Sequence, residues 1–310
     1  MNRRSSIRAL VHSTADALRQ ARMRPELNTL LRSTVGARPW RFRVPDPLWK
    51  RLPVVGEFHV EVPGTPGFRY IARGEPLGKT LFWRGIDGFE PGTAKVFRVL
   101  AEQSSTLLDV GAYSGYYAVL ARTINPRIKA HCFEPVPGLQ EWIQEHIAHN
   151  RMEDSIVVVP EVVSDTEGNV AFYAMTSPNM PSGSLLSEYG GEERYKLEAR
   201  SCRLDEYARR LKRPADLIKI DAEGAELQVL RGATGLFETT RPYVVCEILE
   251  PDRTDEIEVL ASRHDYGFGQ IVREGVRPMD AIIPDPRRRD RNFLFWPKEK
   301  GVPDGLQAVR

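Results

Sequence analysis

The feature that most constrains this chain is a repeated alternation of short apolar runs with longer helical segments between residues 106 and 248. Short apolar runs bounded by turn residues are typical of buried strands, and the segments between them carry apolar side chains at helical spacing. Helices that connect parallel strands cover both faces of the sheet that those strands form. The pattern therefore predicts a Rossmann-like α/β domain with a mostly parallel sheet.

Several segments have the pattern of strands or helices. We expect strands at Leu107–Val110, Lys129–Phe133, Ile156–Val159, Val170–Tyr173, Leu217–Asp221, Tyr243–Ile248, Phe268–Val272 and Asn292–Trp296. We expect helices at residues 92–103, Gly115–Thr123, Gly138–Asn150 and Ala225–Arg231, and a half-buried strand at residues 57–63. Residues 175–198 have no regular pattern, which predicts either a lid or binding loop or a mobile surface insertion.

Composition and pattern together divide the chain into four parts. Residues 1–52 are predicted to be a basic helical extension, and residues 53–105 a lead-in rich in strands with one helix. Residues 106–298 form the α/β domain, and residues 299–310 a C-terminal tail. The 310 residues are 41% hydrophobic and 28% charged, as in an ordinary globular protein.

The cysteines and the hydropathy indicate a location. The chain has no apolar run of the roughly 20 residues that cross a bilayer, and its start lacks the pattern of a signal peptide. Its three cysteines, Cys132, Cys202 and Cys246, lie far apart, which argues against a disulfide framework and against zinc. A reducing cytoplasm is therefore the expected location.

The N-terminal extension is strongly basic, although the net charge of the chain is only +2. Residues 1–51 contain twelve Lys or Arg and three Asp or Glu. Such an arm either contacts an acidic membrane surface or partner, or is a solvated helix that docks on the main domain or a second subunit. It lacks aromatic interleaving beyond Trp40 and Phe42, so we expect no nucleic-acid partner. The oligomeric state is left open.

The first chemical signal is the loop after the strand at residues 107–110. Asp109 lies near the end of this strand, and the turn that follows is Gly111, Ala112, Tyr113, Ser114 and Gly115. A dinucleotide site has close glycines, and the bulky Tyr113 disfavours one. The loop suits a ligand with an ammonium and a carboxylate group, which Asp109 and the loop N–H groups would meet. Turn chemistry and capping are the alternative explanations.

The second signal is Glu134, which ends the next predicted strand and is followed by Pro135. An acidic side chain about 20 residues after a glycine loop is where a ribose diol is held, because a carboxylate accepts hydrogen bonds from both hydroxyls. A surface glutamate at a strand end is the alternative. Together the two signals predict a site for an adenosyl compound.

The third signal is a set of acids at the ends of later strands: Asp221, Glu223 and Glu247. At the same edge of the sheet they would orient an acceptor, accept a proton or hold a divalent cation, or else anchor loops. Lys219, inside an apolar strand, is expected to pair with one of these acids. Arg287, Arg288, Arg289 and Arg291 either meet an anionic acceptor or form a solvated loop.

With these motifs the chain resembles the FkbM-type methyltransferases over about residues 80–296. The matching segments are Asp109–Tyr117, Phe133–Pro135, Val162–Asp165, Gly183–Leu185, Leu217–Glu226 and Asn292–Leu294. The block Lys-Ile-Asp-Ala-Glu-Gly from Lys219 is rather specific to the family. The family often has Asn where Tyr113 stands and Val where Ala222 stands.

The resemblance implies a class I methyltransferase fold with a seven-stranded sheet and S-adenosylmethionine as the methyl donor. It places Asp109, Gly111 and Gly115 beside the methionine half of the cofactor and Glu134 on the ribose. It places Val163, Ser164 and Asp165 at the edge of the adenine. It further implies O-methylation of a sugar hydroxyl in a glycan, glycolipid, lipo-oligosaccharide or glycosylated natural product.

The family gives no firm catalytic base. Asp221 is the first candidate for a base or acceptor orienter and also borders the cofactor, with Glu223 and Glu247 behind it. A divalent cation is not expected. The alternatives are an N-methyltransferase that acts on a peptide or small molecule, and a non-catalytic adenosyl-binding module that docks on a partner.

Overall fold

A computed structural model of the chain describes residues 29–30, 34–35, 45–175, 183–186, 194–249, 253–284 and 290–306. Most of the predicted N-terminal extension lies outside these residues. The chain separates into two compact units, of which one ends at Phe89 and the other comprises residues 62–68 and everything from Glu90 onward. The second unit contains every acid that the sequence assigns to a site.

The smaller unit is built around a two-stranded sheet. Strand β1 (Val55–Val60) pairs with β2 (Phe68–Arg73), and the helices α3 (Asp46–Trp49), α4 (Pro76–Arg84) and η2 (Ile86–Gly88) accompany them. Phe58 and Phe82 pack edge to face, with their ring centroids 5.2 Å apart. Strand β1 confirms the half-buried strand expected at residues 57–63, although it begins two residues earlier.

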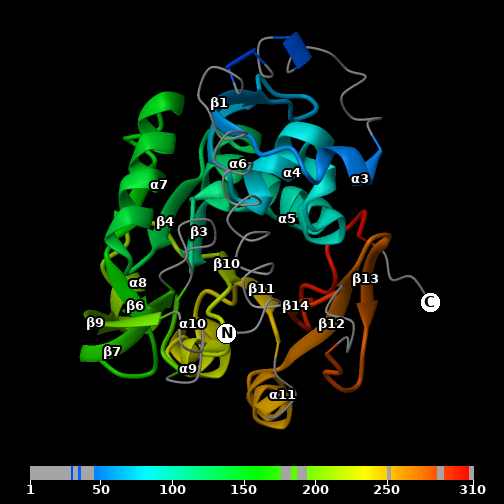
Figure 1. Cartoon of the computed structure of the whole chain (residues 1–310). Helices are drawn as coiled ribbons and strands as arrows, with labels where there is room; N and C mark the ends of the chain where they lie inside the picture. The colour runs from blue at the N-terminus through cyan, green and yellow to red at the C-terminus, as the bar shows by residue number, and fades with distance from the viewer. Residues whose placement is uncertain are drawn as a thin grey trace, which may run out of the picture. The chain divides into compact units, whose positions relative to one another are not determined.

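The larger unit contains an eight-stranded sheet with the order β13-β12-β14-β11-β10-β3-β4-β5 (Figure 1). Its parallel strands are β3 (Thr106–Val110), β4 (Lys129–Phe133), β5 (Ile156–Val159), β10 (Leu217–Ile220) and β11 (Tyr243–Glu247). Strands β12 (Tyr266–Val272), β13 (Gly275–Pro278) and β14 (Asn292–Pro297) add antiparallel pairs. The fold confirms the predicted α/β class, with one strand more than seven because β13 extends β12 as a hairpin.

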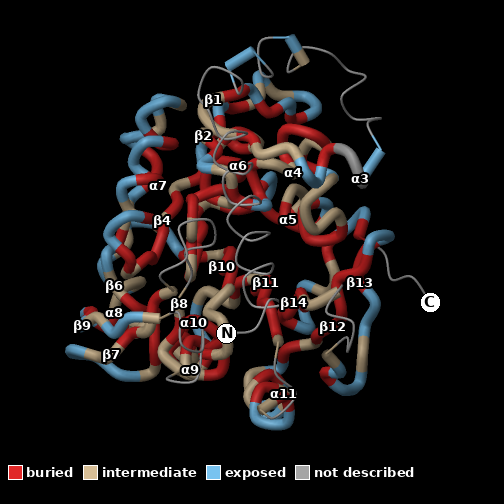
Figure 2. The backbone as a smooth tube through the Cα atoms, in the orientation of Figure 1, coloured by how far each residue is buried: buried red, intermediate tan, exposed pale blue. Residues whose placement is uncertain are grey.

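Helices cover both faces of this sheet. Helices α5 (Pro91–Gln103), α6 (Tyr116–Ile124) and α7 (Pro137–Asn150) pack on one face. Helices α8 (Leu204–Ala208), α9 (Glu226–Arg231), α10 (Thr234–Glu238) and α11 (Thr254–Arg263) contribute side chains to the apolar core on the other face. The central strands are buried along their length (Figure 2). No helix in the described ranges is long and apolar enough to cross a membrane.

The two faces of the central strands differ in chemistry. Leu108, Ile218 and Val244 point into the core under α9 and α11. Because side chains alternate along a strand, their neighbours Asp109 and Lys219, which are register partners, point to the opposite face. The buried charged groups of these strands therefore lie on the face opposite the core under α9 and α11, and they share that face with further buried apolar side chains.

A second sheet differs from the prediction. Strand β7 (Gly168–Met175), expected in the main sheet, belongs to a separate four-stranded sheet of order β6-β9-β7-β8, with β6 (Glu161–Val163), β8 (Gly183–Ser184) and β9 (Arg194–Cys202). The expectation of irregular chain over residues 175–198 is therefore wrong for residue 175 and for residues 183–184 and 194–198, which belong to strands, whereas 176–182 and 187–193 lie outside the described residues. Charged side chains on β9 hid its apolar alternation.

Candidate functional site

The loop between β3 and α6 is held against the end of β4. The backbone N–H groups of Gly111 and Ala112 both donate to the carbonyl of Phe133, at 3.1 and 3.2 Å. Gly115 closes the turn by donating to the carbonyl of Ala112 at 2.7 Å. Gly111, Tyr113 and Gly115 all have positive φ angles, of 73°, 55° and 72°. The loop is thus a tight turn in which glycine is required at two positions.

Gly111 also permits the close approach of two strand ends. A Cβ atom on Gly111 would lie 1.9 Å from the carbonyl oxygen of Asp221, at the end of β10. A Cβ atom on Gly115 would lie 2.9 Å from Cγ2 of Ile143 on α7. The predicted glycine positions therefore bring β3, β10 and α7 together at one edge of the sheet.

Glu134 is buried at the end of β4 and bridges two loops. Its carboxylate accepts hydrogen bonds from the backbone N–H groups of Tyr113 and Val136, each at 3.0 Å. Burial raises its pKa to about 7, against the effect of these two donors. A carboxylate has about four lone-pair sites, so two remain for other donors. The predicted ribose position is thus fixed to the glycine loop, and Pro135 follows it directly.

We expect the substitution Glu134→Gln to weaken binding of S-adenosylhomocysteine by about 100-fold, because it weakens the two charge-assisted hydrogen bonds that the ribose hydroxyls are predicted to donate to this carboxylate. In the unmodified chain, binding is predicted to favour ionised Glu134 and ionised Asp109, each with a pKa of about 7, so affinity should fall by about 10- to 100-fold per pH unit below pH 7 and level off above it. Titration calorimetry between pH 5.5 and 8 measures both effects. Glu145→Gln, on the exposed face of α7, is the control; equal affinities for both variants would contradict the ribose assignment.

Asp109 is buried in β3, only 2% exposed, and points to the face that α5 and α6 cover. Its Oδ2 atom accepts no hydrogen bond in the described part of the chain. Burial raises the pKa of Asp109 to about 7, although the ammonium of Lys219 acts in the opposite direction. A buried acceptor without a donor is costly, so this oxygen fits a ligand that brings a donor.

Lys219 lies at the centre of the acidic groups. Its Nζ atom is 3.5 Å from Oδ2 of Asp221 and 5.4 Å from the ring centroid of Tyr117, and the side chain is 1% exposed. Burial lowers the pKa of Lys219, but Asp221, Glu90, Glu247 and Asp109 outweigh that effect and raise it. The pairing with an acid that the sequence predicts is confirmed.

Asp221 and Glu247 form a hydrogen-bonded carboxyl pair at neighbouring strand ends. Burial and the charge of Asp221 raise the pKa of Glu247, whereas Lys219 lowers the pKa of Asp221 against the effect of burial. Arg291 approaches Glu247 with an Nε–Oε1 distance of 3.1 Å. Arg291 is therefore in an ion pair rather than a solvated loop, whereas residues 287–289 lie outside the described residues.

Glu223 is placed differently from these two acids. It has a positive φ of 50°, and its backbone carbonyl accepts a hydrogen bond from Oγ of Ser184 at 2.7 Å. Glu226 shapes the same loop by accepting from the N–H groups of Ala222 and Gly224. Of the three acids expected to converge, the structure pairs Asp221 with Glu247. Within the described ranges no three metal-ligating side chains are grouped around a common point.

Val163, Ser164 and Asp165 lie at the end of β6 in the second sheet. Val163 is part of the apolar core, and the N–H of Ser164 donates to the carbonyl of Cys202 at 3.0 Å. Arg203 donates to the carbonyl of Asp165 at 2.7 Å. These contacts hold residues 163–165 in place where β6 ends. Their role at the adenine edge stays a prediction.

Glu90 and Asn292 were not assigned to the site from the sequence. Oε2 of Glu90 accepts hydrogen bonds from the hydroxyl of Tyr117 and from Nδ2 of Asn292, each at 3.0 Å. Glu90 also faces Lys219, whose charge lowers its pKa against the larger effect of burial, which raises it. The local signal was an acid before a proline at the start of a helix, which is too common to indicate a site.

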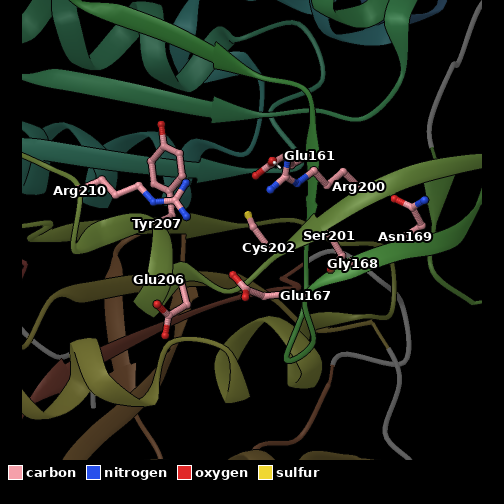
Figure 3. A pocket seen from close by; sticks show the side chains of 10 residues that line it. All are labelled: Glu161, Glu167, Gly168, Asn169, Arg200, Ser201, Cys202, Glu206, Tyr207 and Arg210. Carbon is pink, nitrogen blue, oxygen red and sulfur yellow. Dashed lines mark ion pairs between the residues drawn. The ribbon is translucent and has the colours of Figure 1, made fainter.

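A cavity of about 350 Å³ lies apart from these groups, on the second sheet (Figure 3). In Figure 3 Tyr207 and Arg210 lie on one side of it, and Glu161 and Arg200, an ion pair at 3.2 Å, lie on the other. None of the predicted site residues lines this cavity. Its side chains carry both charges and range from exposed to buried, and no residue role follows from it.

The order of the parallel strands, with antiparallel β14 beside β11, defines the class I methyltransferase-like α/β fold. The glycine loop after β3 and the buried Glu134 after β4 lie at the carboxyl ends of neighbouring parallel strands of this sheet. Residues 109–268 match the methyltransferase FkbM domain. This match spans more than half of the chain, and the chain belongs to the FkbM methyltransferase family.

Two curated proteins are similar to the chain. It is 26% identical over 183 residues to the hexuronic acid methyltransferase AglP of Haloferax volcanii. This match covers 58% of this chain and 71% of the relative. The chain is also 26% identical over 195 residues to the methyltransferase sdnD of Sordaria araneosa, in a match that covers 52% of this chain and 73% of the relative.

Solved structures are similar at low identity. The FkbM methyltransferase of Methylobacillus flagellatus KT is 16% identical, with a TM-score of 0.43, over 62% of this chain and 43% of that chain. An O-methyltransferase of Bacillus cereus in complex with SAH is 13% identical, with a TM-score of 0.40, over 66% of this chain and 80% of that chain.

Proposed function

We propose that the chain transfers the methyl group of S-adenosylmethionine to a hydroxyl group of a sugar, in a glycan, a glycolipid or a glycosylated natural product. The observation that carries this proposal is the joined glycine loop and Glu134, in a chain of the FkbM family. The name of AglP, which denotes a hexuronic acid methyltransferase, supports a sugar acceptor. The three cysteines are buried and free, which supports a reducing cytoplasm as the location.

The groups at the strand ends fit this cofactor. The unpartnered Oδ2 of Asp109 suits an ammonium donor, and the free lone pairs of Glu134 suit a ribose diol. When bound, S-adenosylmethionine supplies a methyl group that is attached to a sulfonium. The sulfur is the leaving group, and it leaves as a neutral thioether. The residues of this chain then position the acceptor and take its proton.

Asp221 is the residue that we propose to orient the acceptor hydroxyl and receive its proton. Its side chain is 35% exposed at the edge of the site, whereas Glu247 behind it is 5% exposed. The charge of Lys219 keeps Asp221 ionised, so it accepts a hydrogen bond from the hydroxyl. As the new oxygen–carbon bond forms, the proton of the hydroxyl moves to this carboxylate and then to solvent.

The substitution Asp221→Asn tests this role. We expect affinity for S-adenosylhomocysteine to change by less than about threefold and methyl transfer to slow by about 10²–10⁴-fold, the range for loss of a positioned base. The assay uses labelled S-adenosylmethionine with glycan and glycolipid extracts, and the products are analysed by mass spectrometry. A full rate in Asp221→Asn would rule out the assigned role.

The same products separate the proposal from its alternatives. Methyl groups on sugar oxygen support it, and methyl groups on nitrogen of a peptide or small molecule would instead make the chain an N-methyltransferase. Binding of cofactor without turnover on any extract would favour a docking module. The basic arm, as a contact for a membrane or partner, lies outside the described residues.

A further inference from the structure

We propose that Glu90 and Asn292 supply further acceptors for the ammonium group of the cofactor's methionine half. This inference rests on the proposed use of S-adenosylmethionine. It adds two residues, at the start of α5 and the start of β14, to a site that the sequence placed at the ends of β3, β4, β6, β10 and β11. The inference concerns binding of the cofactor and does not depend on the identity of the methyl acceptor.

Glu90 is held in a costly conformation at the N-cap of α5. Its φ and ψ angles are 43° and 62°, in the left-handed region that residues other than glycine rarely adopt. Its side chain makes no capping hydrogen bond to the helix. Both of its donors, Tyr117 and Asn292, bind Oε2, and no described residue donates to Oε1. One carboxylate oxygen is therefore fixed while the other remains available.

Asn292 supplies a second unused acceptor at the same place. Its Nδ2 donates to Glu90, which directs the amide toward that carboxylate. Its Oδ1 accepts no hydrogen bond within the described part of the chain, although the residue is only 4% exposed. Asn292 is the register partner of Glu247, so its side chain lies on the polar face of the sheet with Asp221 and Lys219. A donor from a ligand would satisfy this oxygen.

The balance of charge favours a cation as that ligand. Four acids, Asp109, Glu90, Asp221 and Glu247, act on Lys219, and Arg291 is the second cation that faces them. Glu247 is protonated at neutral pH because its pKa is raised to about 10, and the three other acids, when ionised, still outnumber the two cations. An ammonium brings a positive charge and three donors, whereas a hydroxyl brings one donor and no charge. Burial also raises the pKa of Glu90, as expected for an acid without enough compensating charge.

The substitution Glu90→Gln tests this assignment, because it removes the charge and keeps an oxygen for Tyr117 and Asn292. We expect affinity for S-adenosylhomocysteine, which carries the ammonium, to fall by about 10- to 100-fold. Affinity for 5′-methylthioadenosine, which lacks the whole amino-acid half, is expected to change by less than about twofold. Calorimetry on the full chain measures both. Glu102→Gln, exposed on the same helix, is the control and is expected to leave both unchanged.

The outcomes are distinct. Equal losses for both ligands would mean that Glu90 only shapes the fold, and a loss for S-adenosylmethionine but not for S-adenosylhomocysteine would mean that it faces the sulfonium; either result overturns the assignment. Asn292→Leu, checked with Glu90→Gln for an unchanged unfolding transition, should show the same selectivity for the amino-acid half. If the unmodified chain binds neither ligand, the proposed function itself fails.

Discussion

Replacement of Gly111 by alanine is expected to abolish detectable binding of S-adenosylhomocysteine and to lower the free energy of unfolding by about 3 kcal/mol or more. Gly111 has a φ of 73°, where alanine costs about 1–2 kcal/mol. The added Cβ atom would also lie 1.9 Å from the backbone carbonyl oxygen of Asp221, which cannot rotate away. The ends of β3 and β10 must therefore separate, and the loop that they support is displaced.

Gly138→Ala is the matched control for this substitution. Gly138 lies in the first turn of α7, where an added Cβ atom meets nothing within 4 Å. Because alanine favours helix over glycine by up to about 1 kcal/mol, Gly138→Ala should be neutral or slightly stabilising. Urea denaturation and calorimetry on both variants make the comparison. Cofactor binding by Gly111→Ala at normal affinity would show that the close contact of β3 and β10 does not shape the site.

The second large effect is expected for Lys219→Met. Methionine has nearly the same length as lysine but no charge, so the acids around it lose their buried counter-ion. Removal of one partner from a buried ion pair costs about 3–5 kcal/mol, and we expect a loss of that size in the free energy of unfolding at pH 8. Lys95→Met, an exposed position on α5, should change stability by less than about 0.5 kcal/mol.

The loss of unfolding free energy in Lys219→Met should depend on pH, because the acids around position 219 titrate. The pKa of Lys219 is raised in the folded chain, so its contribution is fully present at pH 8. The pKa of Asp109 is about 7, so Asp109 takes up a proton as the pH falls through this range, whereas Glu247, with a pKa of about 10, is already protonated at pH 8. Protonated acids need no counter-ion. The difference between Lys219→Met and the unmodified chain should therefore shrink from pH 8 to pH 5.5, and a constant difference would contradict the ionic explanation.

The sequence predicted those parts of the site whose residues follow one another closely in the chain. Gly111, Gly115 and Glu134 follow strands whose apolar runs are plain in the sequence, and the structure joins them as expected. The strands β4 and β5 have the predicted bounds, and the others differ by a few residues at their ends. Local pattern was sufficient here because a strand, a turn and a helix follow one another directly.

The parts that were missed depend on the order of the strands in space. Asn292 joins the row of Asp221 and Glu247 only because β14 inserts beside β11 in the antiparallel sense. Glu90 joins it because α5 starts over the same end of the sheet, near Tyr117 of α6. Neither arrangement can be predicted from the residues that neighbour Asn292 or Glu90 in the sequence. The second sheet was missed because the charges of β9 mask its alternation.

The division of the central strands into a polar and an apolar face has a consequence for how such a chain changes over time. Asp109 is flanked by Leu108 and Val110, and Lys219 by Ile218 and Ile220, so a charged group and the side chains of the apolar core lie at adjacent positions of one strand. Substitutions in the polar row leave the side chains of the apolar row in place, but they cost stability where they unbalance the buried charges, as Lys219→Met is expected to do. The groups that choose a ligand are therefore constrained by their balance of charge rather than by the packing of the core.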